Sequence, residues 1–172
     1  YGCPILWAEG HSAEPPLTKD KNGNWLPPQG GWKGVLKFTK ADLSARYAEL
    51  APRGQVDFVV IGCPQASIEE IRRTASAVRS YAEMGAKIPD NRLWLFTSGE
   101  NYQLAVDDGS VDLLEDAGVV LLQDTCPEVT PYNRNKYNHL LTNSLKAEHY
   151  LTSGLNRIPT SVMSIQDCVA HA

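Results

Sequence analysis

Three of the four cysteines in this 172-residue sequence follow closely on segments that have the pattern of buried strands. They are Cys63, Cys126 and Cys168, and they are separated by 63 and 42 positions. Because parallel strands place their carboxyl ends at one edge of a sheet, where α/β proteins bind ligands, we expect the three thiols to converge. Converging thiolates bind zinc or an iron–sulfur cluster. The sequence contains no C-x₂-C pair of the kind that structural zinc sites use, which favours a cluster.

Other interpretations of the same cysteines stay open. A zinc or redox-thiol protein would use the same three side chains, and a binding domain without a cluster would keep them as small buried hydrophobes. The fourth cysteine, Cys3, precedes its predicted strand and is interpreted as structural. With only three protein ligands, one iron of a four-iron cluster would stay open as a Lewis acid for substrate.

The elements that must position these residues alternate along the chain. Continuous apolar runs predict strands, and amphipathic stretches with capping residues predict helices. The predicted strands are 34–39, 56–62, 92–97, 119–124 and 158–164, and the predicted helices are 40–51, 66–85, 99–109, 111–118, 138–154 and 165–172. This alternation predicts an α/β fold with a mainly parallel sheet and helices on both faces, a three-layer αβα arrangement. The order of the strands cannot be derived from the pattern.

Length and composition indicate one α/β domain over residues 1–172, with a long irregular loop at 11–34 that is rich in proline and glycine. The chain starts without methionine, so we expect a fragment of a longer protein. Its 16 basic and 20 acidic residues give a net charge of −4 without a basic stripe, which disfavours nucleic acid as a partner. The apolar runs are too short for a membrane span. Four cysteines without a disulfide pattern indicate a reducing, cytoplasmic location.

Five segments, "VIGCPQASIEE", "LFTSGENYQLA", "LQDTCPEV", "NSLKAEHY" and "SIQDCV", together resemble the aconitase X family in content and order. The resemblance covers residues 56–172 and corresponds to the later, cluster-bearing part of that family's large region or subunit. It implies an aconitase-like fold and an iron–sulfur cluster, [4Fe-4S] or [2Fe-2S], held by Cys63, Cys126 and Cys168. It also implies a hydro-lyase acting on a small hydroxy acid, such as cis-3-hydroxy-L-proline or mevalonate 5-phosphate. A small swivelling domain or subunit would complete the site and supply the base, because no convincing catalytic base is found in this chain.

The resemblance also points to residues that would contact substrate. They are Thr97, Ser98, Asn143, Ser144, Lys146 and His149. Ser98 precedes a predicted helix, where free backbone N–H groups attract anions, although a serine there is also an ordinary cap. Lys146 and His149 share a helix face and could hold a carboxylate or phosphate, or simply face solvent. The sequence departs from the family pattern at Gln65, where histidine is expected, and at Leu145, where glycine is expected.

Overall fold

The computed structural model describes residues 18–26, 37–89, 91–133 and 135–172. The chain divides into two compact units, residues 1–39 and 40–172, whereas one domain over residues 1–172 is predicted from the sequence. In the described part of the first unit, Lys19 and Trp25 pair in an antiparallel bridge around a turn that the Asp20 side chain holds. The rest of the expected loop at 11–34, together with Cys3, lies outside the described residues.

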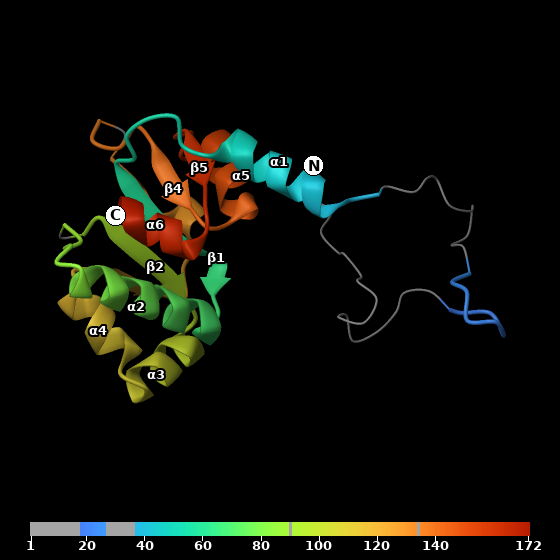
Figure 1. The fold of residues 1–172 in the computed structure, drawn as a ribbon, viewed down its shortest axis with the longest axis horizontal. Coiled ribbons are helices and arrows are strands. Elements are labelled where there is room, and N and C mark those ends of the chain that lie inside the picture. Colours follow the sequence, from blue (N-terminus) through green and yellow to red (C-terminus); the bar gives the residue numbers. More distant parts are fainter. Residues whose placement is uncertain (1–17, 27–36, 90, 134) are drawn as a thin grey trace. The chain divides into compact units, whose positions relative to one another are not determined.

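Among the described residues of the second unit, five parallel strands form one sheet with the order β3-β2-β1-β4-β5 (Figure 1). The strands are β1 (Phe58–Ala66), β2 (Leu93–Thr97), β3 (Val120–Gln123), β4 (Leu140–Thr142) and β5 (Thr160–Val162). The helices are α1 (Lys40–Leu50), α2 (Ile68–Glu83), α3 (Gly99–Asp107), α4 (Ser110–Asp116), α5 (Leu145–Ser153) and α6 (Ile165–His171), with the 3₁₀ turn η1 (Pro127–Val129). The predicted α/β class with a parallel sheet is confirmed.

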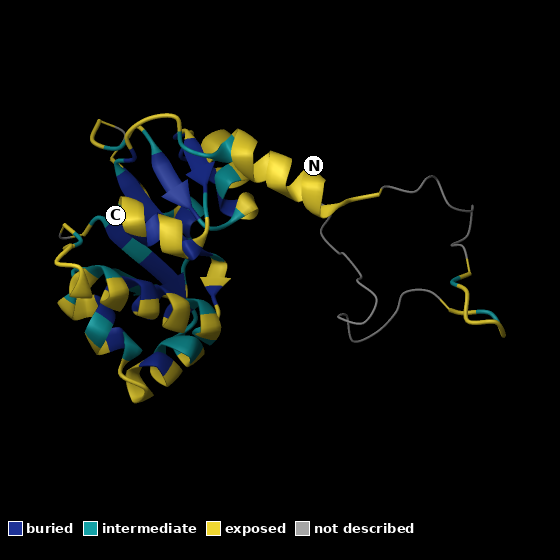
Figure 2. Cartoon of the chain, in the orientation of Figure 1, coloured by how far each residue is buried: buried dark blue, intermediate teal, exposed yellow. Residues whose placement is uncertain are grey.

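Successive side chains along each strand point to opposite faces of the sheet, so the apolar residues form two cores, one on each face. Val59 and Ile61 of β1 pack with α2, α4 and α6, and we call this the α2 face. Phe58 and Val60 point the other way, towards α5 and the segment after β3, which we call the α5 face. Figure 2 shows the buried strands between exposed helix surfaces. The three-layer arrangement follows from this two-sided burial.

The strand order reverses between β1 and β4, because β2 and β3 lie on one side of β1 and β4 and β5 on the other. The chain must therefore cross back from β3 at the sheet margin to β4. This crossing segment, residues 124–139, runs over the α5 face, where η1 contacts β1 and α5. Open α/β sheets bind ligands at such a reversal, outside the carboxyl ends of the strands.

Two predicted elements were wrong. The helix predicted for 138–154 is instead the strand β4 followed by α5, since a three-residue strand between β1 and β5 leaves too short a pattern to recognise. The predicted strand 34–39 is not formed at residues 37–39, and its first half lies outside the described residues. The capping box at Ser67 and Glu70, which starts α2, is confirmed. In the described part of the chain, every helix is too short or too polar to cross a lipid bilayer.

Candidate functional site

An irregularity at the end of β1 positions Cys63. Ile61 pairs with Leu95 of β2, but the next registered pair is Ala66 with Thr97, so four residues of β1 stand opposite one of β2. Gly62 begins this bulge with φ +92°, and a Cβ there would collide with the main-chain oxygen of Phe96. Only glycine fits both conditions. The bulge turns Cys63 out of the strand pairing and leaves it half-buried.

Cys126 is near enough to Cys63 to act on its thiol electrostatically. Burial raises the pKa of the Cys63 thiol above its ordinary value, and the Cys126 charge raises it further. The Lys146 ammonium and a hydrogen bond from Ser144 act in the opposite direction. Cys126 reaches this position because it precedes η1 in the segment that crosses over β1. The structure thus brings these two predicted ligands together at the strand-order reversal.

The start of α5 adjoins this cysteine pair. The Ser144 hydroxyl donates to the main-chain oxygen of Cys63 (3.1 Å) and also accepts from Ala147 N–H as the cap of α5 (3.3 Å). The Asn143 side chain accepts from Gly62 N–H (3.3 Å) and donates to the Glu70 carboxylate (3.1 Å). These bonds fix the bulge of β1 against β4 and α2.

The remaining predicted substrate contacts have other surroundings. The buried Thr97 hydroxyl donates to the main-chain oxygen of Ala66 (2.8 Å), and the Ser98 hydroxyl caps α3. His149 is exposed, and its ring packs edge-on against Tyr150 with centroids 5.3 Å apart. Of the six predicted residues, Asn143, Ser144 and Lys146 are therefore the ones tied to the cysteine pair.

Cys168 lies in α6, where the sequence predicts a short helix after the last strand, but it does not converge with the other two thiols as expected. It is fully buried in the core of the α2 face, with Sγ 3.9 Å from the main-chain oxygen of Met163. Burial raises the pKa of its thiol to about 12. Cys63, by contrast, packs against the core of the α5 face. Among the described residues, no group of three or more His, Cys, Asp or Glu side chains could hold a metal ion. As placed here, Cys168 lies in the opposite core from Cys63, so the three thiols do not come together.

Two polar residues that follow Cys126 were not predicted from the sequence as candidate site residues. In the described part of the chain, Glu128 Oε2 and Tyr132 Oη are buried polar atoms without a hydrogen-bond partner. Burial raises the pKa of the Tyr132 phenol, and the charges of Cys126, Glu128 and Cys63 raise it further. Both residues belong to the segment "CPEVTPY" that follows β3. Their short distance from Cys126 in the sequence could have marked them as candidates. The burial of their polar atoms could not be predicted from the sequence.

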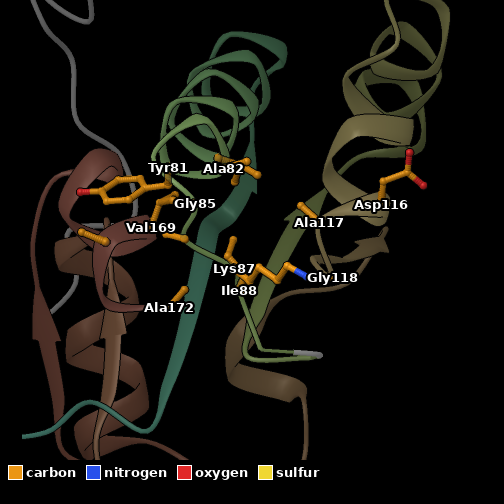
Figure 3. A pocket seen from close by; sticks show the side chains of 13 residues that line it. Tyr81, Ala82, Gly85, Lys87, Ile88, Asp116, Ala117, Gly118, Val169 and Ala172 are labelled. Atoms are coloured by element: carbon orange, nitrogen blue, oxygen red, sulfur yellow. The ribbon is translucent and has the colours of Figure 1, made fainter.

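A surface cavity of about 550 Å³ lies elsewhere, where the carboxyl ends of α2, α4 and α6 meet (Figure 3). Tyr81, Lys87, Asp116 and Val169 are among its lining residues. These helix ends lie at the amino edge of the sheet, because each helix runs antiparallel to the strand before it. The lining contains none of the predicted site residues.

The fold and this edge define an open parallel α/β domain with a thiol pair at its strand-order reversal. The sequence model described as the aconitase X third domain matches residues 56–172, and the chain belongs to the aconitase X family. It is 34% identical over 119 residues to the phosphomevalonate dehydratase large subunit of Aeropyrum pernix, a match that covers 69% of this chain and 29% of that protein. The protein of the same name from Methanothermobacter thermautotrophicus is 36% identical over 95 residues, 55% of this chain and 22% of its own length.

A solved structure shares the fold. The crystal structure of Thermococcus kodakaraensis aconitase X (holo-form) superimposes with a TM-score of 0.67 and 21% identity, over 88% of this chain and 38% of that one. The chain therefore spans less than a third of the length of the dehydratase subunits and under two fifths of the solved structure.

Proposed function

We propose that this chain is part of the large subunit of a hydro-lyase that dehydrates a small hydroxy acid, with mevalonate 5-phosphate the first substrate to test. The observation that carries the proposal is the meeting of Cys63 and Cys126 at the strand-order reversal of an aconitase X domain. The relatives named phosphomevalonate dehydratase support this substrate, and cis-3-hydroxy-L-proline is the alternative within the same chemistry.

The proposed role of the α5 start is to bind the acidic group of the substrate. Lys146 supplies a positive charge next to Cys63, and α5 adds free backbone N–H groups at its amino end. Ser144 and Asn143 keep this end in place against the β1 bulge. We keep three further residues as proposed substrate contacts, to be made only in the assembled protein: His149, Thr97 and Ser98. Substrate orientation by fixed groups is a large part of catalysis in such sites.

We further propose that Cys63 and Cys126 are ligands of an iron–sulfur cluster. Bound there, the cluster would supply Lewis acidity at the leaving hydroxyl. Cys168 stays the proposed third ligand only if α6 moves, because its thiol now lies in the opposite core. The three described cysteines are free, which is compatible with the reducing cytoplasmic location proposed from the sequence. The name "large subunit" of the relatives implies a small-subunit partner. In this proposal, a small subunit completes the site and provides the catalytic base.

Anaerobic purification of the full-length protein, followed by iron and acid-labile sulfide analysis, tests the ligands. We expect Cys63→Ser and Cys126→Ser each to lose the bound iron. Cys168→Val keeps an apolar side chain of similar size and serves as the matched comparison. Retained iron in this variant would place the third ligand elsewhere, and lost iron would show that α6 rearranges.

The same preparations test the reaction. The full-length protein with its small subunit is expected to dehydrate mevalonate 5-phosphate, and cis-3-hydroxy-L-proline is assayed beside it. If the protein contains zinc and no acid-labile sulfide, the iron–sulfur cluster is refuted and the cysteines form a zinc or redox-thiol site. Unchanged metal content in Cys126→Ser, with no turnover of either substrate by the wild type, would identify a binding domain and refute the proposal.

A further inference from the structure

The helix α1 has little packing to stabilise it. It contains 11 residues, and all of these described residues are exposed except Leu50, the last, which is partly covered. Figure 2 shows α1 exposed along its length, and its carboxyl end contacts β5. An isolated helix shorter than about 12–15 residues is marginal in water, because helices gain most of their stability from packing an apolar face. The helix therefore calls for a covering surface.

The large apolar side chains of α1 lie on one face. Leu43, Tyr47 and Leu50 are four and three positions apart, so they share a side of the helix, which we call the Tyr47 face. Leu43 is 38% exposed and Tyr47 is 37% exposed. The opposite side carries the small residues Ala41 and Ala45. An apolar partner would therefore gain more from covering the Tyr47 face than from covering its opposite.

The Tyr47 face continues into a groove at the edge of the sheet. The groove has a volume of about 350 Å³ and lies between the end of α1 and the carboxyl end of β5, the edge strand of the described sheet. Its apolar lining residues are Tyr47, Ala51, Val162 and Met163. Its polar lining residues, Ser164 and Asp167, bond to each other (2.6 Å) at the start of α6. The groove therefore suits an apolar surface better than a polar ligand.

The helix α1 lies ahead of the segment that defines the third domain. The family model matches residues 56–172, whereas α1 is Lys40–Leu50. The word "third" implies that other domains precede this one in the family's chain. The relatives have room for them, because the match covers 29% of the Aeropyrum pernix subunit and 38% of the solved aconitase X chain. A surface from this preceding part is the nearest candidate to cover α1.

The covalent connection favours a domain of the same chain over a separate partner. A surface joined through a short linker is present at an effective concentration of about millimolar, whereas a second copy must bind at its concentration in solution. Obligate dimers also bury about 2,000 Å² or more, which one short helix face and a groove do not supply. Interfaces between domains of one chain are smaller, about 600–1,500 Å², and fit this patch better.

We propose that the Tyr47 face of α1, with the groove beside β5, packs against an apolar surface of the domain that precedes the third domain in the same full-length chain. This contact would hold the start of the third domain against its neighbour. It does not depend on the cluster, the substrate or the small subunit proposed above.

Photocrosslinking in the full-length protein identifies the surface that covers α1. With p-benzoylphenylalanine in place of Tyr47, we expect a crosslink within one chain, to a residue on the amino-terminal side of residues 1–172. The same group in place of Ala45, on the opposite side of α1, is the control and should give no such crosslink. A crosslink to a second copy or to a small subunit, a crosslink confined to residues 1–172, or none at all, would overturn the proposal.

Hydrogen–deuterium exchange in the same protein tests the face with matched variants. Leu43→Ser combined with Tyr47→Ser should speed exchange of the α1 amides about thirtyfold or more, because the cover is lost. Ala41→Ser combined with Ala45→Ser has the same spacing and should stay within about fivefold, the helix-propensity cost of two serines. The β1 amides check the fold, since both described cores lack α1 residues. Equal effects of the two pairs, or no effect of the first, would refute the assigned face.

Discussion

The glycine that begins the β1 bulge offers the sharpest test of how this edge is built. Gly62 has φ +92°, and a Cβ would meet the main-chain oxygen of Phe96 and lie 2.8 Å from Ala66 N. A positive φ costs an alanine about 1–2 kcal/mol, and forcing an atom into packed backbone costs about 1–3 kcal/mol more. We therefore expect Gly62→Ala to lower the free energy of unfolding by about 2–5 kcal/mol. For a domain of this size the melting temperature should fall by roughly 6–15 °C.

Two other glycines separate these contributions. Gly85 has φ +81° but open space around its Cβ position, so Gly85→Ala should show only the conformational cost of about 1–2 kcal/mol. Gly54 has neither a positive φ nor a neighbour within 4 Å, so Gly54→Ala should be neutral or slightly stabilising. Urea unfolding followed by circular dichroism measures all three variants. Equal losses for Gly62→Ala and Gly85→Ala would refute the collision with β2.

Three further predictions, each with its own comparison, concern the pH dependence of stability, the core around α5 and the hydrogen bonds of Asn143. Because the pKa of the Cys168 thiol is raised from 9.0 to about 12, the unfolded chain loses its proton first, so stability is complete below about pH 9 and is lost as pH rises towards 12. The free energy of unfolding should fall about 1.4 kcal/mol per pH unit more steeply in the wild type than in Cys168→Val, and parallel curves would contradict this. Leu151→Ala, which empties a fully buried position of α5, should cost about 2–5 kcal/mol in urea unfolding. Leu155→Ala, at a position 71% exposed, should cost less than about 0.5 kcal/mol, and similar losses would disprove the assigned core. Asn143→Ala removes the hydrogen bonds that link the β1 bulge to α2. It should lower the free energy of unfolding, measured by urea unfolding, by about 1–2 kcal/mol. Asn138→Ala is the comparison, because it keeps the hydrogen bond from its backbone N–H to the Asp57 carboxylate. An equal loss of stability in this variant would argue against the stabilising role of the Asn143 hydrogen bonds.

Local patterns in the sequence were sufficient for most of the elements. Apolar runs marked β1, β2, β3 and β5, and the capping box marked the start of α2, because these signals depend on neighbours within a few residues. The motifs around Cys63 and Cys126 identified the aconitase X family, which the match over residues 56–172 confirms. Cys63 and Cys126 both lie close to the carboxyl ends of strands, as the sequence pattern predicts, and their role as ligands stays a prediction.

Tertiary structure alone decided which of these residues meet. The reversal of strand order sends the segment after β3 back over β1, and this crossing brings Cys126 to Cys63. The same crossing leaves Tyr132 buried and Glu128 partly buried, although both look like ordinary loop residues in sequence. Cys168 follows β5 by only a few residues, yet one turn of α6 directs it into the opposite core. Strand order and helix orientation depend on contacts between residues far apart in the chain, and a local pattern contains no information about those partners.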